Sequence, residues 1–174
     1  MSKTKKIVLT GPESTGKSSL INKLAEYFAM PCVPEIARNY VLNLKRQYNY
    51  QDVVKIAELQ IEKESQMMNS GHAFVFFDTD LIITKIWMLH CFGKQPSWLD
   101  QAIISTAADL HLLCYYDLIW EPNPVRENPD IRPELFLKYK REIIRNGMNY
   151  RVVKGVNDTR FQNARKAVQD FFDI

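Results

Sequence analysis

The chain has 174 residues, of which 46% are hydrophobic and 25% are charged, a composition typical of a folded globular domain and not of a disordered segment. Its 23 Lys and Arg residues nearly balance 20 Asp and Glu residues, and a formal net charge of +3 argues against a dedicated nucleic-acid-binding protein. No apolar stretch is long enough for a signal peptide or a membrane span, so we expect a cytoplasmic protein without a membrane partner.

The first predicted unit is a strand, a glycine-rich loop and a helix. Residues 7–10 form a short apolar run, and the apolar positions between residues 17 and 28 recur at helical spacing. Between them, residues 11–18 read Gly-Pro-Glu-Ser-Thr-Gly-Lys-Ser and match the phosphate-binding (Walker A) pattern G-x-x-x-x-G-K-[ST]. The strand before the loop and the helix after it are the context in which backbone N–H groups converge on phosphates. This unit predicts a nucleotide site.

The loop residues have distinct expected roles. Backbone N–H groups would cradle the phosphates, Lys17 would reach the β- and γ-phosphates, and the Ser18 hydroxyl would bind Mg²⁺. The expected nucleotide-binding residues are Gly11, Glu13, Ser14, Thr15, Gly16, Lys17, Ser18 and Ser19. ATP and Mg²⁺ are the expected cofactors, and GTP is disfavoured because the chain has no Asn-Lys-x-Asp motif.

A short strand between two prolines and then a helix are predicted next, over residues 31–34 and 35–44. Glu35 and Arg38 lie three residues apart at the start of this helix and therefore share one face. The spacing leaves two interpretations open: both side chains contact an acceptor substrate, or they pair with one another.

Residues 73–77 form the most apolar strand of the chain, and two carboxylates follow it. Because ligands bind outside the carboxyl ends of parallel strands, Asp78 is expected to hold Mg²⁺ through water or to accept a proton from the acceptor hydroxyl. Asp80 is the alternative in either role, or else the N-cap of a helix over residues 81–92.

The remaining elements continue the alternation of strands and helices, which predicts an α/β fold with a parallel sheet. They are a helix over residues 52–69 with Asp52 as its N-cap, a helix over 99–108, a strand over 110–115, a helix over 133–145, a strand over 150–154, and a last helix capped by Asn157 or Asp158. With no internal repeat or linker, one domain is expected over residues 1–174. Residues 154–158 are the expected place for an adenine ring.

A proline-rich stretch over residues 121–129 predicts a loop within a lid segment of about 118–134. Arg126 and Arg132 lie in this segment and are expected to stabilise the negative charge that phosphoryl transfer develops. Four aromatic residues are candidates for stacking on a flat acceptor ring, although such residues more often belong to a core. They are Tyr40, Trp87, Trp98 and Trp120.

The three cysteines and three histidines show no metal-binding or disulfide spacing. Cys32, Cys91 and Cys114 are far apart and form no C-x-x-C pair, which is typical of a protein from a reducing compartment. The histidines are expected to be packing or surface residues.

Three of these segments resemble the kinase domain of the bacterial bifunctional NAD-salvage proteins, which join ribosylnicotinamide kinase to nicotinamide mononucleotide adenylyltransferase. They are the phosphate loop, Val-Pro-Glu-Ile-Ala-Arg at residues 33–38, and Asp-Thr-Asp-Leu at residues 78–81. The resemblance implies a fold of the P-loop nucleoside and nucleotide monophosphate kinases, related to AAA-type ATPase domains, with a parallel five-stranded sheet. It also implies phosphorylation of the 5′-hydroxyl of nicotinamide riboside or a similar nucleoside, with Asp78 or Asp80 near the magnesium and that hydroxyl.

The chain departs from this family in two respects. It has no counterpart of the adenylyltransferase half, and its lid reads Trp-Glu-Pro-Asn-Pro-Val-Arg at residues 120–126, without the Asp-Gly pair of the family. These departures bear on the lid contacts and on the identity of the substrate. Separately, a nucleotide-binding regulatory module without a small acceptor is the alternative function, and a kinase of nucleic-acid ends is the less favoured one. The sequence leaves the oligomeric state open, a homo-oligomer included.

Overall fold

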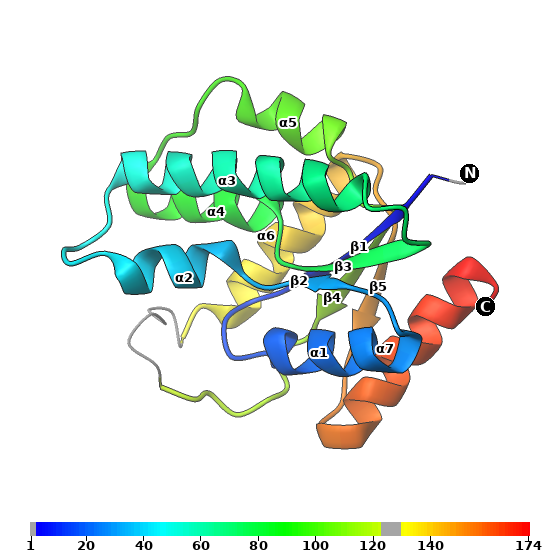
Figure 1. Ribbon diagram of the computed structural model, residues 1–174. Coiled ribbons are helices and arrows are strands. Elements are labelled where there is room, and N and C mark those ends of the chain that lie inside the picture. The colour runs from blue at the N-terminus through cyan, green and yellow to red at the C-terminus, as the bar shows by residue number, and fades with distance from the viewer. Residues whose placement is uncertain (1–2, 123–129) are drawn as a thin grey trace.

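The computed structural model describes residues 3–122 and 130–174, which form a parallel sheet between two layers of helices (Figure 1). The elements in chain order are β1 (Lys5–Thr10), α1 (Lys17–Phe28), β2 (Cys32–Val33), α2 (Ile36–Asn43), α3 (Tyr50–Met68), β3 (Phe74–Asp78), α4 (Leu81–Phe92), α5 (Leu99–Ser105), β4 (Leu110–Cys114), α6 (Arg132–Arg145), β5 (Tyr150–Val153) and α7 (Asn157–Phe172). None of the described helices is long and apolar enough to cross a membrane.

The sheet has five strands in the order β2-β3-β1-β4-β5, and every described pair is parallel. This arrangement confirms the predicted α/β fold class. Strand β1 is central, and its register pairs Leu9 with Asp78 of β3. Because parallel strands end at the same edge, the register brings Asp78 beside the loop that follows β1.

Alternating side chains of the strands supply a separate core for each face of the sheet. Phe74 and Phe76 of β3 pack with α1 and α7 on one face, while Val75 and Phe77 belong to the other face. Helices α3 to α6 cover that second face, as Figure 1 shows. All five β3 side chains are buried, which explains the continuous apolar run in the sequence.

Several element ends differ from the sequence prediction. The last helix, α7, is capped by neither Asn157 nor Asp158: its N-cap is Val156, which makes no side-chain cap hydrogen bond, and Asn157 and Asp158 are its first two residues. Asn49, and not Asp52, is the N-cap of α3: its side chain accepts the Asp52 N–H, and the Asp52 carboxylate accepts the Asn49 N–H. Helix α5 ends at Ser105 and not at residue 108, because Asp109 exchanges hydrogen bonds with Lys6 and so requires extended backbone.

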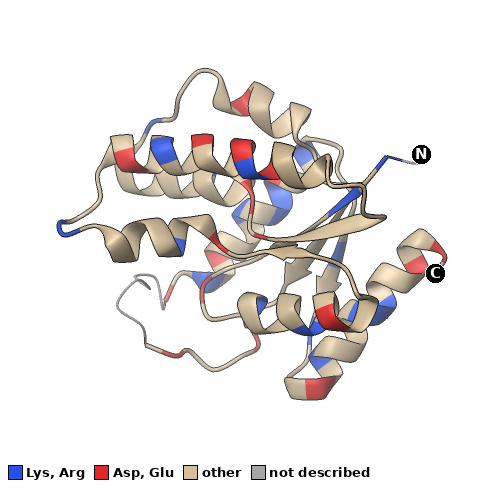
Figure 2. Ribbon diagram, viewed as in Figure 1, with Lys and Arg blue, Asp and Glu red and all other residues tan. Residues whose placement is uncertain are grey.

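Charged residues of both signs are mixed along the helices (Figure 2), and several form exposed pairs that contribute little to stability.

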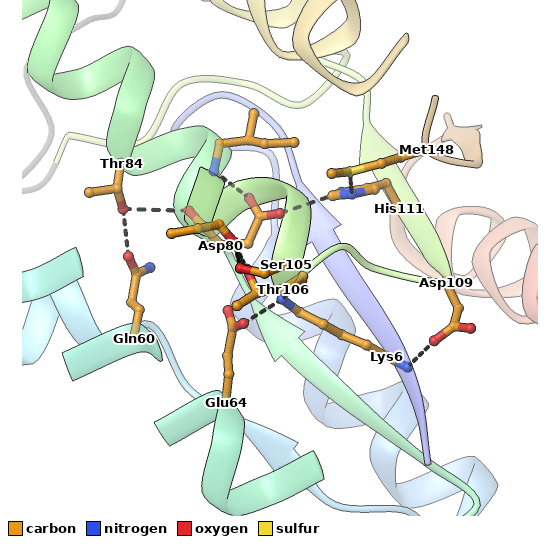
Figure 3. Close-up of polar contacts among 12 residues, drawn as sticks. Lys6, Gln60, Glu64, Asp80, Thr84, Ser105, Thr106, Asp109, His111 and Met148 are labelled. Atoms are coloured by element: carbon orange, nitrogen blue, oxygen red, sulfur yellow. Dashed lines mark hydrogen bonds and ion pairs between the residues drawn. The ribbon is translucent and has the colours of Figure 1, made fainter. Parts of the chain in front are cut away.

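One ion pair differs from these because it is buried. The Lys6 Nζ of β1 lies 2.5 Å from the Glu64 Oε2 of α3, and both side chains are at most 6% exposed. Lys6 also donates to the Thr106 carbonyl oxygen (2.7 Å), so the pair joins β1, α3 and the end of α5 (Figure 3).

Burial raises the pKa of Glu64 to about 7, and Lys6 only partly opposes this shift. The folded protein therefore binds a proton between about pH 4.5 and 7 that the unfolded chain releases, and this contribution to stability is lost as the pH rises through that interval. We predict that Glu64→Gln, which mimics the protonated carboxyl, removes a slope of at most about 1.4 kcal/mol per pH unit. Urea unfolding at pH 5, 6, 7 and 8 measures this slope.

The control is Glu62→Gln, which changes an exposed carboxylate of the same helix and should leave the slope unchanged. Equal slopes in the wild type and in Glu64→Gln would contradict the prediction.

Candidate functional site

The phosphate loop leaves β1 through a position that only glycine fits. Gly11 has a φ of +153°, and a Cβ there would lie 2.7 Å from the Cys114 carbonyl oxygen at the end of β4. Further along the loop, Thr15 Oγ1 donates to the Pro12 carbonyl oxygen (2.8 Å) and is fully buried. The loop is therefore held by strand contacts on one side and by its own hydrogen bonds on the other.

Lys17 opens α1 and lies along the inside of the loop. Its Nζ donates to the carbonyl oxygens of Gly11 (2.9 Å) and Pro12 (2.8 Å). The ammonium group is thus already at the concave face of the loop, where phosphates are expected from the sequence pattern.

The next residue, Ser18, joins the loop to the end of β3. Its hydroxyl donates to Asp78 Oδ2 (2.6 Å), while Asp78 Oδ1 is buried and has no hydrogen-bond partner among the described residues. A buried carboxylate oxygen without a partner is costly unless something else binds it. A hydroxyl and a carboxylate are oxygen ligands of the kind that Mg²⁺ prefers, so Ser18 and Asp78 fit a magnesium site.

Asp80 has the contacts of a helix cap, which was one of its expected roles. Its Oδ1 accepts the N–H of Ile82 (3.1 Å), and its Oδ2 lies 3.9 Å from Nδ1 of the buried His111. His111 in turn bonds to Thr10 Oγ1 (2.9 Å), and burial lowers the pKa of this imidazole. Figure 3 shows Asp80 and His111 next to the Lys6 and Glu64 pair. Asp80 lines neither of the two large cavities described next.

The first cavity, here called the loop cavity, has a volume of about 650 Å³ and surrounds the phosphate loop. Besides residues 13–20, its walls come from the segment after β4 and from the start of α7. Arg160 is part of this wall and is fixed by hydrogen bonds to Asp117 (2.7 Å) and to two carbonyl oxygens. Val156 and Asn157 lie here too, so the expected adenine segment does line the cavity that holds the loop.

The second cavity, here called the α4 cavity, has a volume of about 610 Å³ and lies on the other side of the loop. Helix α4 supplies much of its wall, and the remainder comes from α2, α6, the phosphate loop and the segment between α2 and α3. Its aromatic lining residues are Tyr48, Trp87, Phe92 and Tyr139. Of the four aromatic candidates from the sequence, only Trp87 lines this cavity, and its Nε1 donates to the Tyr48 hydroxyl (3.2 Å).

The two cavities meet at a shared wall made of Glu13, Lys17, Glu35 and Arg38. Glu35 precedes α2, and burial raises the pKa of its carboxyl although the charge of Lys17 opposes the shift. Arg38 Nη2 lies 3.2 Å from Glu35 Oε2. The two residues therefore pair, as one of the two interpretations from the sequence expected, and both also line the cavities.

The described ends of the expected lid lie against the phosphate loop. Ser14 Oγ accepts the N–H of Glu121 (2.9 Å) and donates to the Ile119 carbonyl oxygen (3.4 Å). Arg132, the first residue of α6, donates to the Leu118 carbonyl oxygen (2.8 Å) and lines neither cavity. Arg126 lies outside the described residues.

Several cavity residues were not identified from the sequence. Asp117 follows the end of β4, and the rule that ligands bind at the carboxyl ends of parallel strands could have found it. Tyr48 and Tyr139 carry no such signal, since they come from a loop and from the middle of a helix that only tertiary packing brings to the α4 cavity.

Comparison with known proteins places these features in a family. Residues 6–160 match the family described as AAA domain. The trifunctional NAD biosynthesis/regulator proteins NadR of Salmonella typhimurium and Escherichia coli are each 27% identical to the chain over 124 residues. This match covers 69% of the chain but 30% of each relative, so the chain spans less than a third of the length of these curated proteins.

Solved structures agree on the fold. A NadR crystal structure in complex with NR has a TM-score of 0.81 at 22% identity, over 98% of this chain and 52% of that one. A NadR complex with NAD and AMP-PNP gives 0.77 at 21% identity, over 98% and 50%. Thymidylate kinase from Ehrlichia chaffeensis gives 0.71 at 14% identity, over 99% and 100%. These similarities confirm the P-loop fold of nucleoside and nucleotide kinases and the family resemblance seen in the sequence.

We predict that Gly11→Ala destabilises the fold through the close approach of β1 to β4. The matched control is Gly71→Ala, since Gly71 also has a positive φ (+79°) but no atom lies within 4 Å of its Cβ position. The new methyl group at residue 11 meets backbone that cannot move away, so Gly11→Ala should lose about 1–3 kcal/mol more than the control. Urea unfolding of both variants checks this, and equal losses would contradict it.

Proposed function

Since the chain belongs to the AAA domain family, we propose that its phosphate loop serves an ATP- and Mg²⁺-dependent kinase that phosphorylates a nucleoside. The observation that carries this proposal is the shared wall of the two cavities. A simple nucleotide-hydrolysing switch needs one ligand cavity, whereas this chain has a second one that opens onto Lys17 and Glu35. Phosphoryl transfer requires that arrangement, because donor and acceptor must meet in line.

The proposed acceptor is nicotinamide riboside, phosphorylated at its 5′-hydroxyl in the cytoplasm as a step of NAD salvage. Three observations support it: the 27% identity to NadR proteins, the likeness to a NadR structure solved with NR, and the aromatic wall of the α4 cavity. A cationic flat ring suits that wall, because Trp and Tyr rings attract both flat rings and positive charge. A similar nucleoside is the alternative acceptor.

In the proposed reaction, an acceptor hydroxyl oxygen attacks the γ-phosphorus of ATP, the bond from that phosphorus to the β–γ bridging oxygen breaks, and ADP leaves. Lys17 and the loop N–H groups hold the phosphates. Glu35 is the proposed base, because it lines both cavities and its raised pKa is suited to accepting the hydroxyl proton. Arg38 would keep this carboxylate oriented.

Ser18 and Asp78 are the proposed magnesium ligands, with Asp78 binding directly or through water. The bound metal would neutralise charge on the β- and γ-phosphates during transfer. Asp78 is less suited to be the base, because one of its oxygens already accepts the Ser18 hydroxyl.

Arg132 is proposed to act with Arg126 as part of the lid at about residues 118–134. In the structure, Arg132 is bonded to Leu118, so it would have to exchange this carbonyl oxygen for a phosphate oxygen. An arginine can make that exchange readily, because phosphate oxygens accept stronger, charge-assisted hydrogen bonds.

The first experiment is ADP production from ATP and Mg²⁺ with a panel of nucleosides, nicotinamide riboside included, and with no acceptor. We predict acceptor-dependent turnover that is greatest for nicotinamide riboside, and a loss of about a hundredfold or more in Lys17→Ala, because the phosphate charge loses its partner. Lys55→Ala, on the exposed surface of α3, is the matched control and should retain activity. Hydrolysis without any acceptor would instead favour the regulatory module.

A second prediction concerns Glu35. If its carboxylate is the base, kcat rises with pH through the raised pKa of Glu35, because only the deprotonated form accepts the proton. Glu35→Gln should lose about 10²–10⁴-fold in kcat and should lack this rise. A pH profile of kcat for both proteins measures it, with Glu26→Gln on exposed α1 surface as control. An unchanged profile in Glu35→Gln would transfer the role to Asp78.

A further inference from the structure

Tyr139 in the middle of α6 belongs both to the protein core and to the α4 cavity. Its ring packs in the same apolar cluster as Leu135, Phe136 and Ile143, and the residue is only 6% exposed. The side chain nevertheless lines the α4 cavity, together with Ile83 and Trp87 of helix α4. The apolar ring is therefore fixed by packing while part of the side chain remains accessible from the cavity.

The hydroxyl of Tyr139 makes no hydrogen bond with any part of the chain that the structure describes. The hydroxyl oxygen is not among the buried polar atoms that lack a partner, so it is accessible from the α4 cavity, which the side chain lines. Core packing alone would be served equally well by phenylalanine. The hydroxyl at this position is therefore explained by neither packing nor internal bonding, which points to a ligand.

The charges around this hydroxyl determine what it can offer a ligand. Burial raises the pKa of Tyr139, and the carboxylates of Glu13 and Glu35 raise it further. The phenol therefore stays protonated at neutral pH and can donate. The two carboxylates, which line the same cavity, can only accept when ionised. The Tyr139 hydroxyl can donate a hydrogen bond, and the carboxylates of Glu13 and Glu35 can accept hydrogen bonds. A ligand with several neighbouring hydroxyl groups matches this set, because each hydroxyl both donates and accepts.

We propose that Tyr139 is a specificity-determining residue that donates a hydrogen bond to the 2′- or 3′-hydroxyl oxygen of a nucleoside in the α4 cavity. This inference rests on the proposed function and adds to it the sugar that the site selects: a ribose and not a sugar lacking the contacted hydroxyl. A site built to bond a hydroxyl rejects an analogue without it, because the polar group of the protein is then left unpaired.

The test compares the wild type with Tyr139→Phe, which retains the ring. We expect the KM for nicotinamide riboside to rise about 3- to 10-fold, as for the loss of one hydrogen bond, while the KM for ATP is unchanged. The melting temperature should be unchanged or higher, because the removed hydroxyl has no partner in the described chain. Tyr27→Phe, on the exposed surface of α1, is the control and should change neither value.

The 2′- and 3′-deoxy analogues of nicotinamide riboside identify the contact. In the wild type, the KM for one of the two analogues should exceed the KM for nicotinamide riboside by the same factor as the substitution produces. In Tyr139→Phe, that analogue and nicotinamide riboside should have the same KM. An unchanged KM in the variant, or equal losses for both analogues in both proteins, would overturn the role of Tyr139 alone. A wild type that phosphorylates no nucleoside at all would overturn the proposed function and this inference together.

Discussion

The hydrogen bond from the Ser18 hydroxyl to the Asp78 carboxylate is the contact on which the site depends. The two residues are 60 positions apart in the chain, and they meet only because β1 and β3 are parallel neighbours that end at the same edge. The bond ties the start of α1 to the end of β3 and so fixes the direction of the phosphate loop. A shift in strand register would separate these residues and remove the candidate magnesium site.

The buried polar residues Thr10, Asp80 and His111 also hold the end of β1 and the start of α4 in place. His111 bonds to Thr10 at the end of β1, and Asp80 caps helix α4, the helix that lines much of the cavity. Between Asp78 and Asp80, Thr79 adopts a φ of +75°, which is rare for a β-branched residue and costs about 1–3 kcal/mol. The backbone turn at Thr79 lets the two carboxylates lie in different environments. Asp78 accepts the Ser18 hydroxyl of the loop, whereas Asp80 caps α4.

Two buried polar atoms next to the phosphate loop lack hydrogen-bond partners among the described residues. They are Asp78 Oδ1, whose other oxygen accepts the Ser18 hydroxyl, and Nε of Arg38, which lines the loop cavity. Each such group costs about 1–3 kcal/mol in the free protein, and the apolar cores on both faces of the sheet must offset that cost. A metal ion or substrate that binds these two atoms would recover that free energy, so the same groups that cost stability can contribute to specific binding.

Local patterns in the sequence were sufficient for the fold class, the phosphate loop, and the carboxylates after β3, because each depends on residues close together in the chain. The cap of α3 was predicted wrongly at Asp52, since Asn49 and Asp52 both suit a cap and only the folded hydrogen bonds distinguish them. Asp80 as the cap of α4 was one of the alternatives from the sequence, since the bond to Ile82 is local. Tertiary structure alone decided the rest: it brought Glu35 beside Lys17 and turned Tyr139 toward the α4 cavity. These placements follow from how helices pack on the sheet, which a one-dimensional pattern does not encode.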